Sequence, residues 1–156
     1  MSRTAARLQE LGLSLPTPAT PIANYAPYAR LGSMLIISGQ LPLGGDGKLA
    51  PEHIGKLTPG ADVGPAKAAA RICAINILAQ ARAALGDLDR VVGVRRLGGF
   101  FNVAESHDAL PQAMNGASDL MAEVFGERGR HARTTVGVAH LPLNALVEVE
   151  AIFEVE

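Results

Sequence analysis

The stretch VEVEAIFEVE, residues 147–156, alternates apolar side chains with mostly acidic ones along its whole length. Alternation with a period of two is typical of a β-strand that turns one face to a core and the other away from it. Residues 147, 149, 151, 153 and 155 mark the core face, whereas four glutamates and Ile152 mark the other face. The chain is therefore expected to end in a strand of a sheet that is covered on one face only.

The residues before this strand predict a hairpin. Residues 133–141 form one expected strand, the turn consists of Pro142, Leu143 and Asn144, and the last strand covers residues 146–156. We therefore expect the strand that begins at residue 133 to pair directly with the last strand.

Two helices and two further strands are predicted upstream. Helices are expected over residues 63–85, with Asp62 as the cap, and over residues 109–125, where apolar side chains recur every three to four residues. Apolar runs predict strands at residues 34–38 and 88–103, and Gly98-Gly99 is expected to break or bulge the second one. The order of elements is strand, helix, strand, helix, hairpin. It predicts an α+β fold in which both helices pack on one face of a single mixed sheet.

The N-terminal 24 residues are expected to lie outside the sheet and its two long helices. Residues 3–11 have the pattern of a short amphipathic helix that Gly12 ends, and four prolines lie between residues 16 and 27. We expect a helix followed by an extended strap that lies on the domain. The 156 residues together are expected to form a single domain, with residues 44–62 as a long loop.

Composition excludes several classes of function. The formal net charge of −1 gives no basic field to attract nucleic acid, and the spacing of histidines and of the single cysteine suggests no metal site. No phosphate-binding glycine motif occurs, so no cofactor is expected. The N-terminus lacks the apolar run of a signal peptide, and no apolar stretch is long enough to span a membrane. We therefore expect a cytoplasmic protein.

Three short motifs, in order, are similar to those of the Rid (YjgF) family. Ala26-Pro27-Tyr28 resembles the family's Gly-Pro-Tyr segment, and residues 37–42, ISGQLP, match its SGQ-x-P strand end. Ala132-Arg133, together with residues 147–152, matches its C-terminal segment. The resemblance implies a chorismate-mutase-like fold, with the two helices on one face of the sheet, and a homotrimer with pockets between subunits. It also implies hydrolytic deamination of reactive enamines and imines, such as 2-aminoacrylate, to 2-oxo acids and ammonia.

The same resemblance assigns two catalytic residues. Arg133 would hold the carboxylate of a small metabolite, a role that suits the planar guanidinium, and Glu148 would act as general base or orient a water. From the residues alone, Arg133 fits a structural ion pair better, and Glu148 fits a solvated face as one of four alternating glutamates.

Four further residues are expected to bind substrate by the same resemblance. Tyr28 would close the pocket, Ser38 and Asn115 would line it, and Thr135, where many family members have Cys, would offer its backbone N–H. Two other functions remain open at this point. One is a regulatory protein that binds a small carboxylate without turnover, and the other is a different hydrolase activity in the same interface pocket.

Overall fold

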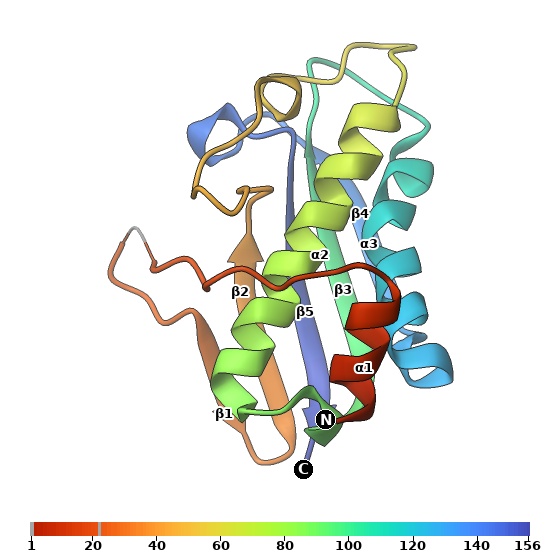
Figure 1. Cartoon of the computed structure of the whole chain (residues 1–156). Coiled ribbons are helices and arrows are strands. Elements are labelled where there is room, and N and C mark those ends of the chain that lie inside the picture. The colour runs from red at the N-terminus through yellow and green to blue at the C-terminus, as the bar shows by residue number, and fades with distance from the viewer. Residues whose placement is uncertain (1, 22) are drawn as a thin grey trace.

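The computed structural model describes residues 2–21 and 23–156, in which one five-stranded sheet carries its helices on one face (Figure 1). The strand order is β1-β2-β5-β3-β4. The strands are β1 (Tyr28–Leu31), β2 (Met34–Gln40), β3 (Val91–Asn102), β4 (Ala132–Val138) and β5 (Val147–Val155), and the α-helices are α1 (Arg3–Glu10), α2 (Gly64–Leu85) and α3 (Leu110–Phe125).

The strand that ends the chain lies in the middle of the sheet. β5 pairs antiparallel with β2 on one side and with β3 on the other. Its side chains alternate strictly between buried and half-buried from Val147 to Val155, which confirms the predicted periodicity. The buried set packs beneath α2, whereas no described element covers the face that carries Glu148, Glu150 and Ile152.

The predicted C-terminal hairpin is wrong. β4 pairs in parallel with β3, so that β3 separates β4 from β5. The pattern of apolar residues shows which face of a strand is buried but not which strand lies beside it. The connection over residues 139–146 is long enough to cross β3, and it includes Leu143 and Asn144 with positive φ angles of 56° and 54°. It is tied to the loop that contains His53, whose carbonyl accepts a hydrogen bond from the Leu146 N–H.

The expected break at Gly98-Gly99 is also absent. β3 continues through both glycines, which pair in register with Glu150 and Val149, and its irregularities lie nearer its start, between Val91 and Arg96. The glycines instead leave room for larger neighbours. A Cβ on Gly98 would lie 2.8 Å from the side chain of Glu150, and one on Gly99 would lie 2.4 Å from the sulfur of Met114. In addition, residues 28–31 form a strand, β1, that was not predicted from the sequence.

Both long helices lie where the sequence predicts them. In α2, the alanines Ala66, Ala70 and Ala81 are fully buried, so the helix lies close to the sheet. The N-cap is Val63 rather than Asp62, although the Asp62 carboxylate still accepts a hydrogen bond from the Gly64 N–H at 3.2 Å. By length and composition alone α2 could cross a membrane, but 56% of its most apolar window is buried inside the protein, as in a core helix.

The N-terminal segment also follows the prediction. α1 ends before Gly12, which has a φ of 66°, and the strap that follows it, described here over residues 13–21 and 23–27, crosses the outer side of α2 (Figure 1). Two side chains of α2 hold the strap: the Gln80 amide donates to the Ala19 carbonyl at 2.8 Å, and the Arg82 guanidinium donates to the Leu15 carbonyl at 3.3 Å. The strap is therefore bound to the domain through its backbone.

Close contact between α2 and α3 depends on Gly116. A Cβ on this residue would lie 1.9 Å from the backbone carbonyl oxygen of Lys67 in α2. We expect Gly116→Ala to lower the free energy of unfolding by about 1–3 kcal/mol, because separating the two helices outweighs the gain of about 1 kcal/mol in helix propensity. Urea unfolding measures the change. The control Gly45→Ala, which meets open space in a loop, should alter stability by less than about 0.5 kcal/mol. Equal effects of the two substitutions would contradict the close-contact role of Gly116.

Candidate functional site

The six residues singled out in the sequence lie in two separate groups. Arg133, Asn115 and Thr135 are together at β4 and α3, at one edge of the sheet. Glu148, Ser38 and Tyr28 belong to the neighbouring strands β5, β2 and β1.

Arg133 is held by α3 through neutral acceptors. One guanidinium nitrogen donates to the Asn115 side-chain oxygen at 2.8 Å and to the Ser118 hydroxyl at 3.2 Å, and the other donates to the Pro111 carbonyl at 3.2 Å. The side chain is exposed, and within the described part of the chain it forms no ion pair. Arg133 is therefore a fixed positive charge that is free to bind an anion.

Ser118 and His131 complete the surroundings of Arg133, although neither residue was predicted from the sequence to belong to the site. The His131 Nδ1 lies 2.6 Å from the Gly129 carbonyl oxygen and must donate to it, so Nε2 of the neutral ring accepts from the Ser118 hydroxyl at 2.9 Å. Burial, and to a lesser extent the charge of Arg133, lower the pKa of His131, although the Gly129 carbonyl opposes them. The neutral ring thus orients Ser118 to accept from Arg133. The only signal in the sequence is the i, i+3 spacing of Asn115 and Ser118 on one helix face.

Thr135 lies two residues after Arg133, on the same side of β4. Its hydroxyl oxygen is buried and has no hydrogen-bond partner among the described residues. A buried hydroxyl without a partner is unfavourable and is usually satisfied by water or a ligand. The side chain, and not only the backbone N–H, is therefore a candidate for a polar contact.

Glu148 is a half-buried carboxylate on the uncovered face of the sheet. Within residues 2–21 and 23–156 it forms no ion pair. Desolvation by burial, and then the like charge of Glu150, raise the pKa of the Glu148 carboxyl above its ordinary value. Gly39 on β2 leaves room for this group, since a Cβ there would lie 2.0 Å from a Glu148 carboxylate oxygen. An unpaired carboxylate with a raised pKa is suited to accept a proton.

Ser38 and Tyr28 have structural partners. The Ser38 hydroxyl donates to the Ala26 carbonyl at 2.7 Å and so holds the end of the strap against β2. Tyr28 pairs with the buried Ile37 and packs at the margin of the core. Both residues lie near Glu148 in the sheet, but these contacts give them positioning roles within one chain.

The geometry keeps Arg133 and Glu148 apart. Phe100 of β3 is opposite both Glu148 and Val136, so these three side chains share the uncovered face. Arg133 is three residues from Val136 and therefore points to the other face, toward α3. The backbones of Arg133 and Glu148 are also far apart. They are two strand spacings, or about 10 Å, apart across the sheet, and three residues, or about 10 Å, apart along the strands. One small ligand cannot reach both side chains of a single chain.

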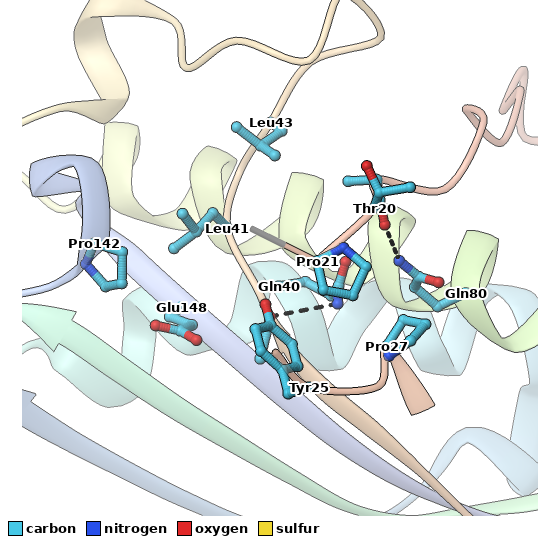
Figure 2. Close-up of a pocket in the computed structure, with 12 residues that line it drawn as sticks. Thr20, Pro21, Tyr25, Pro27, Gln40, Leu41, Leu43, Gln80, Pro142 and Glu148 are labelled. Carbon is cyan, nitrogen blue, oxygen red and sulfur yellow. Dashed lines mark hydrogen bonds between the residues drawn. The ribbon is translucent and has the colours of Figure 1, made fainter. Parts of the chain in front are cut away.

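A cavity of about 80 Å³ lies beside Glu148 (Figure 2). Glu148 and Pro142 lie on one side of it, and the strap residues Pro21 and Pro27 lie on the opposite side. Leu41 and residues near it complete the lining, and the wall is partly polar and partly apolar. Among the described residues, no group of three or more His, Cys, Asp or Glu side chains could hold a metal ion.

The pKa of Glu148 can be measured directly. In a carboxyl-carbon NMR titration we expect its midpoint to lie above that of an exposed glutamate. Glu150→Gln should move this midpoint to lower pH, because ionisation of Glu148 would no longer place two negative charges side by side. Glu154→Gln, farther along the same face, is the control and should leave the midpoint nearly unchanged. A midpoint at the ordinary value in the native chain would contradict the described environment.

Comparisons with known proteins place this geometry in a family. Residues 5–155 match the family model described as "YjgF/chorismate_mutase-like, putative endoribonuclease". Protein TCP17 of Trypanosoma cruzi is 48% identical over 153 residues, which covers 97% of this chain and 94% of that protein. The crystal structure of protein Atu1372 of Agrobacterium tumefaciens, of unknown function, is 46% identical, covers 98% of this chain and 92% of that one, and has a TM-score of 0.87.

A second solved structure agrees even more closely in shape. A protein of Shewanella oneidensis described as a "putative endoribonuclease" is 40% identical, with a TM-score of 0.91, and the match covers 99% of this chain and all of that one. The match to the family model and these relatives span the strap, the sheet and both long helices. The chain therefore belongs to the Rid/YjgF family and has its chorismate-mutase-like fold.

Proposed function

We propose that this protein hydrolyses reactive imines and enamines of 2-amino acids, such as 2-aminoacrylate, to 2-oxo acids and ammonia. The observation that carries the proposal is Arg133, an exposed guanidinium fixed by three neutral acceptors and without an acidic partner in the described chain. Such a group is prepared to bind the carboxylate that all these substrates share.

Glu148 supplies the proton acceptor that hydrolysis requires. An enamine first takes a proton at its terminal carbon and becomes the imine. Water then adds to the carbon of the C=N bond, and Glu148 accepts a proton from that water and returns it to the nitrogen, which gives a carbinolamine. Glu148 next transfers the remaining hydroxyl proton to the nitrogen, so that the C–N bond breaks, the C=O bond of the 2-oxo acid forms and ammonia leaves. The raised pKa of Glu148 suits a group that both accepts and returns a proton near neutral pH.

We further propose that the site is assembled between subunits of a homotrimer. Arg133 and Glu148 of one chain point to opposite faces, so a shared ligand needs each residue from a different subunit. The uncovered face also exposes Met34, Ile36 and Val136, each 39% accessible in the single chain. Apolar side chains gathered on one face favour contact with another subunit, and cyclic symmetry closes such contacts.

The endoribonuclease description of the Shewanella relative receives less support here. The uncovered face carries Glu148, Glu150 and Glu154, of which Glu154 pairs with Arg95. Unpaired carboxylates repel a phosphate backbone, whereas a small carboxylate bound at Arg133 stays clear of them. Imine hydrolysis therefore fits the distribution of charge better.

The role of Arg133 is tested by pyruvate release from 2-aminoacrylate generated in the assay. We expect Arg133→Ala to lower kcat/KM about 100-fold, because charge-assisted hydrogen bonds contribute about 1.5–3 kcal/mol each. The control Arg130→Ala removes a nearby charge that is paired with Glu127, and it should change kcat/KM less than about threefold. Turnover by Arg133→Ala at the native rate would reject the proposed function.

The shared site is tested by mixing two inactive variants. Arg133→Ala and Glu148→Gln are refolded together in equal amounts. In a cyclic trimer each mixed trimer contains one site with both native residues, so about one quarter of the native activity should return. Separately refolded variants are the control. Complete lack of recovery, with mixed trimers verified by mass spectrometry, would show that the site belongs to one chain.

A further inference from the structure

The ring of His131 is a titratable group beside Arg133 that the proposed reaction does not use. A hollow of about 290 Å³ opens at the edge formed by α3 and β4, and Ser118, His131 and Arg133 all line it. Both side chains meet the Ser118 hydroxyl oxygen, His131 through Nε2 at 2.9 Å and Arg133 through its guanidinium at 3.2 Å. An anion that Arg133 holds in this hollow therefore lies close to the His131 ring as well.

Hydrogen bonds fix which nitrogen of the neutral His131 ring carries the hydrogen. The Gly129 carbonyl can only accept, and its oxygen lies 2.6 Å from Nδ1, so Nδ1 is the donor. Nε2 then accepts from the Ser118 hydroxyl, whose oxygen in turn accepts from Arg133. Nε2 is thus the atom that an added proton would join.

Ser118 can accommodate a proton on Nε2 without releasing Arg133. Its oxygen has two lone pairs, one for the new Nε2–H group and one for the guanidinium. Its own hydrogen can turn to the backbone carbonyl of Met114, one helical turn earlier in α3, as serines within helices commonly do. A charge on His131 therefore changes the direction of one O–H bond and not the position of the guanidinium.

The surroundings of His131 disfavour this proton while Arg133 binds no anion. Burial is the main cause that lowers the pKa of the His131 ring, and the charge of Arg133 lowers it further. Arg96 of β3 pairs with Ala132 and so points to the other face of the sheet. The remaining charges nearby are engaged with one another or with backbone: Arg130 with Glu127, Lys67 with Asp119, Arg71 with Glu123, and Arg128 with the Val91 carbonyl.

We propose that His131 is a second cation of the carboxylate site, which becomes charged when an anion binds at Arg133. A carboxylate in the hollow offsets the field of Arg133 and favours a proton on Nε2, so the complex takes up a proton that the free protein lacks. The affinity then rises as the pH falls through the titration of His131, and it is constant at higher pH, where the ring is neutral in both forms. The inference rests on the proposed function for the position of the carboxylate.

Calorimetry of pyruvate binding tests this inference, because pyruvate stays ionised near neutral pH and its binding needs no turnover. Glu148→Gln is the background, since it removes a carboxyl whose pKa is raised. We expect the dissociation constant to fall about fivefold from about pH 8 to about pH 5. Titrations in two buffers with different ionisation enthalpies should show uptake of protons.

Two further substitutions in this background identify the group that takes the proton. His131→Gln should abolish the pH dependence and the proton uptake, and it should change the affinity at about pH 8 less than about twofold, since glutamine can accept from Ser118 but cannot be protonated. His140→Gln removes an exposed histidine, is the matched control and should keep both effects.

The His131 ring can also be followed in the native protein. In imidazole NMR titrations, saturating pyruvate should raise the midpoint of His131 by about 0.5–1 pH unit and leave that of His140 unchanged. An unchanged His131 midpoint, or a pH dependence of binding that survives His131→Gln, would overturn the inference. Failure of pyruvate to bind at any pH would overturn it as well.

The outcomes separate this inference from the proposed function. Binding of pyruvate with proton uptake at His131, but without hydrolysis of any imine, would reject the proposed function and support the second cation. Hydrolysis of imines by a protein whose affinity for pyruvate is independent of pH would overturn the second cation while the proposed function stands.

Discussion

Burial of β5 on one face only is the constraint on which the rest of the structure depends. Its apolar side chains lie under α2, and its neighbour β2 alternates in the same way from Met34 to Ile37. The period of two then fixes every glutamate of β5 on the uncovered face, since a shift by one residue would bury them in the core. Glu148 is thus on the open side of the sheet because Val147 and Val149 are needed on the other.

The same constraint divides the chemistry between two faces. α3 covers the far edge of the sheet, and its polar residues Asn115 and Ser118 meet Arg133 there. Glu148 is left without an ion-pair partner in the described chain, and partial burial raises its pKa. Arg133 can bind a carboxylate but has no proton acceptor beside it, and Glu148 can accept a proton but has no carboxylate-binding group beside it. Neither residue alone makes a complete site. This is why the proposed reaction involves a second subunit.

The strap connects the beginning of the chain to this arrangement without belonging to the sheet. Gln80 and Arg82 reach it from α2, and Ser38 reaches it from β2, all through backbone carbonyls. Contacts of this kind fix the path of the backbone and leave its side chains free to vary.

The sequence by itself determined three features of this protein. They are the alternation of buried and half-buried side chains in β5, the positions of α2 and α3, and the short motifs that contain Arg133 and Glu148. These are local patterns, so they can be read from consecutive residues. Only the tertiary structure decided that β3 lies between β4 and β5, that Ser118 and His131 orient Arg133, and that the two catalytic candidates face away from each other. The physical reason is that each depends on which strand or helix becomes a neighbour, a choice made by packing between residues distant in the chain.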